Sequence, residues 1–183
     1  MTQRFTFLLG SARAGGNTEI LARRAAEALP AETEARWLRL AELPLEPFRD
    51  LRHGGVAYPA PTGHAATLLE ATLWATDLVV AAPTYWYSLP AAAKLYLDHW
   101  SWWLRLPGVD FKARMAGKRL WGITVNSDDP GEDGGSAPLL ATLELAAGYM
   151  KMRFGGALVG HGSRPRDVER DTAAMAAARG LFG

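Results

Sequence analysis

The chain has 183 residues, of which 49% are apolar, and this is enough for one domain with a sizeable core. Its formal net charge is only +1 and no apolar run approaches the roughly 18 residues that cross a bilayer, so neither nucleic acid nor a membrane is an expected partner. The absence of cysteine excludes disulfides, iron–sulfur clusters, cysteine-ligated zinc and thiol catalysis, and with no secretory leader before the first apolar run we expect a cytoplasmic protein.

Apolar runs of strand length alternate along the chain with longer segments of helical period. The predicted strands are residues 5–9, 35–40, 78–82, 120–125 and 154–159. The predicted helices are residues 17–29, 64 to about 76, 90 to about 104, 138 to about 152, and 167–179. Between them, residues 42–63 carry four prolines and two adjacent glycines and are predicted to form a long loop.

Five successive strand–helix alternations indicate an α/β fold with a mainly parallel sheet and helices on both faces. The strands are continuous apolar runs, as expected when both faces of the sheet are covered. We expect residues 1–183 to form a single domain. Ligands of such sheets bind beyond the carboxyl ends of the strands, so the loops of interest are residues 10–16, 83–89 and 126–136.

The first of these loops is rich in glycine and leads directly into a helix. Its backbone N–H groups can converge, and the helix N-terminus adds positive potential. Ser11, Asn17 and Thr18 supply further donors, and Arg13 supplies a cation. The loop is neither a Walker motif nor G-x-G-x-x-G. It is typical of a phosphate-binding loop, the alternative being a plain turn in which Asn17 caps the helix.

The second loop carries three adjacent aromatic residues, Tyr85, Trp86 and Tyr87, between Pro83 and Pro90. Aromatic side chains at a strand end suit a flat ring, and loop amides there can bond the edge of a heterocycle. The alternative is that these rings are ordinary core at the edge of the sheet.

The third loop, residues 126–136, is long, acidic and glycine-rich. Its acidic side chains raise the question of a divalent cation, but their spacing matches no EF-hand pattern, and we expect no metal site. The simplest alternative is a solvated connection. A phosphate cradle after the first strand and an aromatic loop after the third together fit a ligand with a phosphate at one end and a flat ring at the other, which is the shape of FMN.

Three motifs resemble the NAD(P)H-dependent FMN reductase family. The sequence G-S-x-R-x-G-G-N-T at residues 10–18 is similar to the family's FMN-phosphate loop. The sequence P-x-Y-x-Y-S-x-P at residues 83–90, followed by Lys94 and Asp98, is similar to its isoalloxazine loop and the helix after it. The glycine pair at residues 134–135 resembles the pair near the flavin. The similarity extends from about residue 4 to residue 160.

The resemblance implies a flavodoxin-like five-stranded parallel sheet of order 2-1-3-4-5. It also implies FMN, with the phosphate at the first loop and the ring at the second. The cofactor-binding residues it predicts are Ser11, Arg13, Gly16, Asn17, Thr18, Pro83, Thr84, Tyr85, Trp86, Tyr87, Ser127, Gly134 and Gly135. Many relatives carry Glu and Asn at the positions of Thr84 and Trp86.

The resemblance further implies NAD(P)H as co-substrate and a small electron acceptor such as a quinone, an azo dye, a nitro compound or free flavin. Because a flavin carries the electrons itself, no catalytic acid or base is expected. His99 and His161 are interpreted as structural residues, and Asp98 as a helix partner. Two other functions remain open: a flavodoxin-type electron carrier without turnover, and a relative that has lost FMN and serves as an interaction protein.

The stretch 96–104 contains an aromatic cluster that predicts a homodimer or a tetramer built from dimers. On a helix, Tyr96, Trp100 and Trp103 share one stripe, and Trp102 lies about 100° from Trp103. One sheet-facing stripe does not cover both directions, so part of this indole surface is expected to meet a second chain. The alternative is a monomer in which the 42–63 loop folds over the rings.

Overall fold

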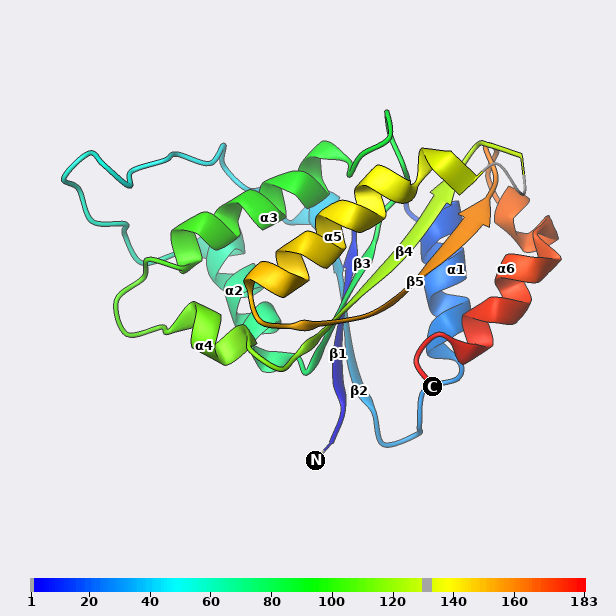
Figure 1. The fold of residues 1–183 in the computed structure, drawn as a ribbon, viewed down its shortest axis with the longest axis horizontal. Coiled ribbons are helices and arrows are strands. Elements are labelled where there is room, and N and C mark those ends of the chain that lie inside the picture. Colours follow the sequence, from blue (N-terminus) through cyan, green and yellow to red (C-terminus); the bar gives the residue numbers. More distant parts are fainter. Residues whose placement is uncertain (1, 130–132) are drawn as a thin grey trace.

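A computed structural model of the chain describes residues 2–129 and 133–183 (Figure 1). At its centre lies one sheet whose strands are β1 (Arg4–Leu9), β2 (Glu34–Arg39), β3 (Asp77–Ala81), β4 (Arg119–Asn126) and β5 (Arg153–His161). All neighbouring strands are parallel, and their order is β2-β1-β3-β4-β5. The predicted flavodoxin-like sheet is therefore confirmed, with β4 and β5 extending past both predicted ends.

Helices cover both faces of the sheet (Figure 1). One apolar cluster joins the sheet to α1 (Asn17–Ala26) and α6 (Thr172–Ala177). The other joins it to α2 (Gly63–Trp74), α3 (Ala91–Trp103), α4 (Phe111–Met115) and α5 (Ala137–Tyr149). Each fully buried Leu or Val contributes about 1.5–3 kcal/mol relative to exposure, which explains the continuous apolar strands. Within residues 2–129 and 133–183, no helix has the length and apolar character that spanning a membrane requires.

The predicted closing helix over residues 167–179 is wrong. The structure has a 3-10 helix, η3 (Asp167–Arg170), then the short α6, then η4 (Ala178–Gly180). The break occurs at Asp171, whose backbone is not helical and whose carboxylate accepts the N–H of Ala174 at 3.0 Å. The same carboxylate accepts the N–H of His161 at 2.9 Å. Asp171 thus ties the last strand to the start of α6, and helical periodicity does not reveal this contact between two elements.

Two further differences concern short or terminal turns. The sequence predicted no helix between residues 104 and 120, whereas five residues there form α4. Such a segment is too short to show a period, and it is held by burial of Phe111 and Met115 rather than by propensity. The first helix ends at Ala26 instead of continuing to residue 29.

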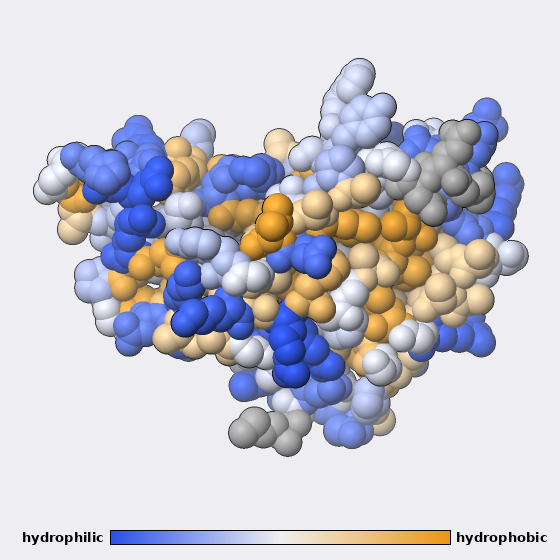
Figure 2. Space-filling view, in the orientation of Figure 1, coloured by the Kyte–Doolittle hydropathy of each residue, from blue (hydrophilic) through white to orange (hydrophobic). Residues whose placement is uncertain are grey.

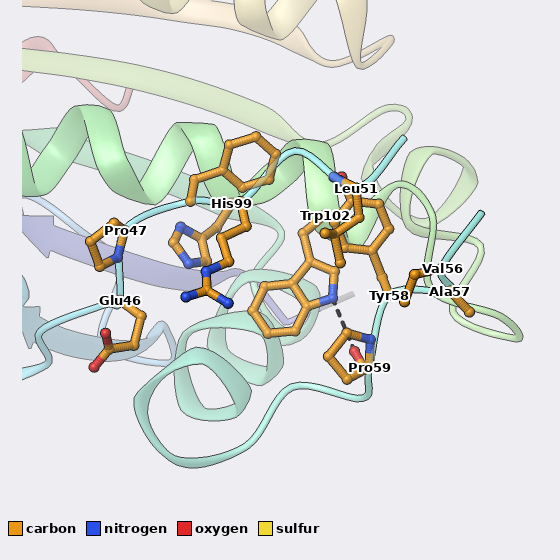
Figure 3. Close-up of a pocket in the computed structure, with 11 residues that line it drawn as sticks. Glu46, Pro47, Leu51, Val56, Ala57, Tyr58, Pro59, His99 and Trp102 are labelled. Carbon is orange, nitrogen blue, oxygen red and sulfur yellow. Dashed lines mark hydrogen bonds between the residues drawn. The ribbon is translucent and has the colours of Figure 1, made fainter. Parts of the chain in front are cut away.

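The long loop folds back over α3, as the monomer alternative supposed (Figure 3). The indole Nε1 of Trp102 donates to the carbonyl of Pro59 at 3.0 Å, and Phe48 meets His99 edge-on with ring centroids 6.1 Å apart. Within the loop, the N–H of Leu51 donates to the hydroxyl of Tyr58 at 2.9 Å. Loop and helix enclose a cavity of about 830 Å³.

The stripe predicted for α3 is confirmed. Tyr96, Trp100 and Trp103 are buried in the core. Trp102 points in the other direction, where the 42–63 loop covers part of it and leaves it half-buried at the edge of the cavity. That part of this indole surface meets a second chain stays a prediction.

Gly10 sets how closely the loop after β1 approaches β3 and α3. Its N–H donates to the carbonyl of Ala81 at 2.9 Å, and a Cβ at this position would lie 2.8 Å from the Cβ of Ala82 and 3.2 Å from that of Ala93. We expect Gly10→Ala to lower the free energy of unfolding by about 1–3 kcal/mol, measured by urea denaturation. The control Gly148→Ala in α5, where a Cβ meets open space, should be neutral or stabilising. Equal stability of Gly10→Ala and the wild type would contradict this close approach.

Candidate functional site

The loops that follow the strands meet at one edge of the sheet, where the strand order reverses between β1 and β3. They enclose a groove of about 490 Å³, which we call the strand-end groove. Its lining includes nine of the thirteen predicted FMN-binding residues: Ser11, Arg13, Gly16, Asn17, Thr18, Pro83, Thr84, Tyr85 and Ser127. The segment after β5 also contributes, through Gly162, Ser163 and Pro165, and the sequence analysis missed it.

A second, smaller hollow of about 190 Å³ adjoins the groove. Trp86, Tyr87 and Gly135, three more predicted residues, line it. The two hollows share Thr84, Asn126 and Ser127, so they form one continuous surface. Gly134 lines neither of them. The structure thus brings together twelve of the thirteen predicted residues.

One end of the groove is the N-terminus of α1. Gly16 is the residue that precedes the helix, and because it has no side chain it leaves the first helical N–H groups uncapped. The hydroxyl-bearing side chains of Ser11 and Thr18 are buried here, and the Ser11 hydroxyl accepts the N–H of Arg13 at 3.1 Å. A helix N-terminus with free N–H groups carries partial positive charge and binds anions.

Asn17 is held in a way the sequence did not predict. It is the first residue of α1 and not its cap. Its side-chain N–H groups donate to the carbonyls of Gly162 and Arg164, at 3.2 and 2.9 Å, which ties the first loop to the segment after β5. The side-chain amide nitrogen is therefore occupied, and Asn17 offers the groove its main-chain N–H.

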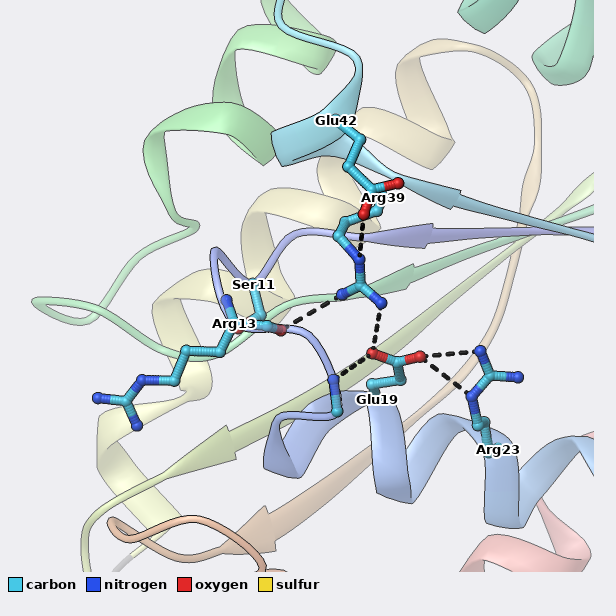
Figure 4. Close-up of polar contacts among 7 residues, drawn as sticks. Ser11, Arg13, Glu19, Arg23, Arg39 and Glu42 are labelled. Atoms are coloured by element: carbon cyan, nitrogen blue, oxygen red, sulfur yellow. Dashed lines mark hydrogen bonds and ion pairs between the residues drawn. The ribbon is translucent and has the colours of Figure 1, made fainter.

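Arg13 provides an exposed cation at this end. Its side chain is exposed, and among residues 2–129 and 133–183 no ion pair holds its guanidinium, which points away from Glu19 (Figure 4). Beneath the loop, a second basic residue, Arg39 at the end of β2, donates to the main-chain carbonyl of Arg13 at 3.3 Å and to the carboxylate of Glu19 at 2.9 Å. The sequence analysis missed Glu19 and Arg39, because their contact joins the first turn of α1 to the end of β2 and belongs to no local motif.

The other end of the groove is a tight hairpin turn in the loop after β3. Tyr85 and Ser88 exchange two main-chain hydrogen bonds of 3.0 Å, and the two residues between them have positive φ, 49° for Trp86 and 63° for Tyr87. Positive φ is rare for aromatic residues and costs roughly 1–3 kcal/mol each. The turn projects the Trp86 side chain outward, with 92% of it exposed. The aromatic residues are thus not core, and the alternative of a buried sheet edge is wrong.

A network of hydroxyl groups forms the floor between the two ends. The hydroxyl of Thr84 lies 2.9 Å from that of Thr124 and 3.0 Å from that of Ser136. The side-chain amide of Asn126 donates to Ser136 at 3.0 Å. The Thr84 hydroxyl is therefore used to hold the loop after β3 against β4 and the start of α5. The main-chain N–H of Thr84 is also occupied, because it donates to the carbonyl of Val125 at 3.1 Å.

The third loop is described only in part, because residues 130–132 lie outside the described ranges. Ser127 borders both hollows, and Gly135 stands against the carboxylate of Asp128. In the part of the chain that the structure describes, no three His, Cys, Asp or Glu side chains are grouped as metal ligands.

The histidines singled out in the sequence have structural contacts. The Nδ1–H of His99 donates to the carbonyl of Leu95 at 2.9 Å inside α3. The Nδ1 of His161 lies 2.9 Å from the carboxylate of Asp171. Partial burial raises the pKa of Asp171, but hydrogen bonds from Ala174 and His161 outweigh it, so this pKa lies below its usual range. Asp98 pairs with Lys94 at 2.6 Å along the helix, as expected of a helix partner.

The chemistry of the groove fits FMN. One end offers uncapped N–H groups, two hydroxyls and a guanidinium to a phosphate. The other end offers the exposed aromatic side chains of the hairpin and the adjoining hollow to a flat ring. The two ends are continuous, which a ligand with a phosphate and a ring requires.

Comparison with known proteins agrees with this geometry. The family model described as NADPH-dependent FMN reductase matches residues 4–180. The Bacillus subtilis (strain 168) protein named "Putative NAD(P)H-dependent FMN-containing oxidoreductase YwqN" is 35% identical over 174 residues, which cover 94% of this chain and 93% of that protein. The solved structure of the Trp repressor binding protein from Bacillus subtilis is 29% identical, with a TM-score of 0.77 and coverage of 98% of this chain and 97% of that one. The NAD(P)H:quinone oxidoreductase from Methanothermobacter marburgensis shares the fold at 15% identity, with a TM-score of 0.71 and coverage of 100% and 95%.

The chain therefore belongs to the NADPH-dependent FMN reductase family. It is an NAD(P)H-dependent oxidoreductase with FMN as its cofactor, as the three motifs predicted.

Proposed function

We propose that the enzyme reduces a small planar acceptor, with a quinone first among the candidates and azo dyes, nitro compounds and free flavin as alternatives. The observation that carries this proposal is the shape of the ring end of the strand-end groove. It is an open hollow beside an exposed aromatic hairpin, where a flat molecule can stack. A solved structure with the same fold is described as an NAD(P)H:quinone oxidoreductase.

Residues 1–183 are taken to form one domain. The two ends of its strand-end groove are assigned to the two parts of FMN. Ser11, Arg13, Gly16, Asn17 and Thr18 hold the FMN phosphate, with Asn17 acting through its main-chain N–H. Pro83, Thr84, Tyr85, Trp86 and Tyr87 hold the ring, with Ser127, Gly134 and Gly135 at its far edge. Bound FMN supplies the two-electron chemistry. The residues of the chain bind and orient, and none is assigned as an acid or a base.

The near-neutral charge favours an enzyme over an electron carrier. A carrier docks on large partners and tends to present a strongly charged face, whereas this chain has a formal net charge of +1. Its exposed aromatic hairpin suits stacking of a small molecule.

Removal of the Arg13 guanidinium tests the assignment of the phosphate. We expect Arg13→Ala to weaken FMN binding by about 10- to 100-fold, because a charge-assisted hydrogen bond contributes about 1.5–3 kcal/mol. Titration of the FMN-free protein, followed by quenching of flavin fluorescence, measures the effect. The melting temperature should not change, because the side chain is exposed. Unchanged affinity would remove Arg13 from the site.

Steady-state kinetics with NAD(P)H and a quinone test the reaction. We expect parallel double-reciprocal lines, because donor and acceptor use the same open ring end in turn and so exclude one another. Menadione is a suitable acceptor, and 1,2-naphthoquinone a second. Intersecting lines point to two separate sites. If neither nicotinamide reduces the bound flavin, the carrier function is the correct one.

We further propose that the enzyme is a homodimer, or a tetramer built from dimers. Two exposed apolar features support this. Trp86 projects from the hairpin beside the groove, and Leu145 and Tyr149 lie one turn apart on α5 with 74% and 64% of their surface exposed. Figure 2 shows apolar side chains gathered over this helix. Such surface usually meets another protein.

Light scattering at micromolar concentration measures the mass of the particle, and we expect twice or four times the chain mass of 19.8 kDa. Leu145→Asp should shift the mass toward the monomer, because a charge on the apolar face of α5 is costly to bury. Glu144→Gln, at the neighbouring exposed position, is the control and should leave the mass unchanged. A wild-type particle of monomer mass ends this proposal.

A further inference from the structure

A buried carboxylate lies directly beneath the phosphate end of the groove. The side chain of Glu19, in the first turn of α1, is only 7% exposed, and both of its oxygens are occupied (Figure 4). One oxygen accepts two hydrogen bonds from Arg23, at 2.8 and 3.0 Å. The other accepts the N–H of Gly15 and a guanidinium N–H of Arg39, both at 2.9 Å.

This carboxylate is ionised at neutral pH. Partial burial raises the pKa of Glu19, but hydrogen bonds from Arg39, Arg23 and Gly15 outweigh it, and the pKa lies below its usual value. A fixed negative charge next to a phosphate site is unfavourable by itself, because like charges repel. The two arginines offset this cost, and with Glu42, which pairs with Arg39 at 3.2 Å, the cluster carries no net charge.

The carboxylate of Glu19 fixes the conformation of the loop after β1. Gly15 has φ of +62°, a left-handed conformation, and its N–H turns toward Glu19 and away from the groove. Without this hydrogen bond, the peptide group of Gly15 would be free to rotate and the loop could take other conformations. With Gly15 held, the N–H groups left for a ligand are those at the start of α1.

Arg39 holds the same loop from the neighbouring strand. Its side chain is 15% exposed, and one guanidinium contacts three partners. It donates to Glu19 at 2.9 Å and to the carbonyl of Arg13 at 3.3 Å, and it pairs with Glu42 at 3.2 Å. The contact with the Arg13 carbonyl matters for an anion site, because a carbonyl oxygen facing the groove would repel a phosphate.

We propose that Glu19 and Arg39 are positioning residues for the FMN phosphate. Together they hold residues 13–15 in the phosphate-binding conformation before the cofactor arrives, and they thereby set the preference of the protein for FMN over riboflavin. Neither residue touches the phosphate. The proposal rests on the assignment of the phosphate to the N-terminus of α1 made above.

The ratio of FMN to riboflavin affinity tests this proposal. Riboflavin has the same ring but no phosphate, so it does not depend on the conformation of the loop. We expect Arg39→Met to weaken FMN binding by about 10-fold or more and riboflavin binding by less than about twofold. Arg39→Lys keeps the charge but not the three-way contact of a guanidinium, and it should recover only part of the affinity for FMN.

Arg36→Met is the matched control. Arg36 lies on the same strand and pairs with Glu70 at 2.6 Å on the exposed surface, away from the loop. Its removal deletes an arginine and an ion pair without touching residues 13–15, so both flavin affinities should stay at the wild-type level. The melting temperature of each variant is measured in parallel.

A double-mutant cycle then tests whether the two residues act together. Glu19→Gln and Arg39→Met should each lower the affinity ratio, and the double variant should lower it by little more than either one alone. Unchanged FMN affinity in Arg39→Met overturns the proposal, as does an equal loss of both flavins with a lowered melting temperature. Equal affinity of the wild type for riboflavin and FMN would contradict the assignment of the phosphate to the N-terminus of α1. This measurement needs no variant, so it separates failure of the phosphate assignment from failure of the positioning proposal.

Discussion

The order of the strands is the constraint on which the site depends. β1 lies between β2 and β3, so the chain leaves β1 toward one side and β3 toward the other. The helix after β1 covers one face of the sheet, and the helix after β3 covers the opposite face. The two loops therefore separate at the sheet edge and leave a hollow between them. The absence of a side chain at Gly10 keeps them close enough to share a ligand.

The two ends of the hollow bind by different physical means. At the start of α1, partial charge and free N–H groups attract an anion, and the loop is held from behind by Glu19 and Arg39. At the hairpin after β3, attraction comes from the surface and edge of aromatic side chains. The hairpin keeps two of its residues at positive φ, which costs free energy that a purely structural turn would avoid by using glycine. Such strain is commonly retained where a loop has to present its side chains.

The 42–63 loop changes how the aromatic residues of α3 are interpreted. A tryptophan-rich helix next to a cofactor loop suggests an interface, but here three rings fill the core and the fourth, Trp102, is partly covered by the chain's own loop. Exposed apolar surface is found on α5 and at the tip of the hairpin. A count of aromatic residues therefore does not locate an interface, because any loop that is long enough can bury them.

The sequence by itself determined the parallel sheet, because strands covered on both faces have continuous apolar runs and the helices between them have a clear period. It also located the two loops that line the strand-end groove after β1 and β3, since both are local motifs whose residues stay adjacent after folding. Tertiary structure decided the rest. The Glu19–Arg39 contact, the occupation of the Asn17 amide by the segment after β5, the tie from Asp171 to the last strand and the contact of Trp102 with the 42–63 loop all join separate elements of the fold. Periodicity and local motifs carry information over a few turns, whereas these contacts exist only once the strands have taken their order in the sheet.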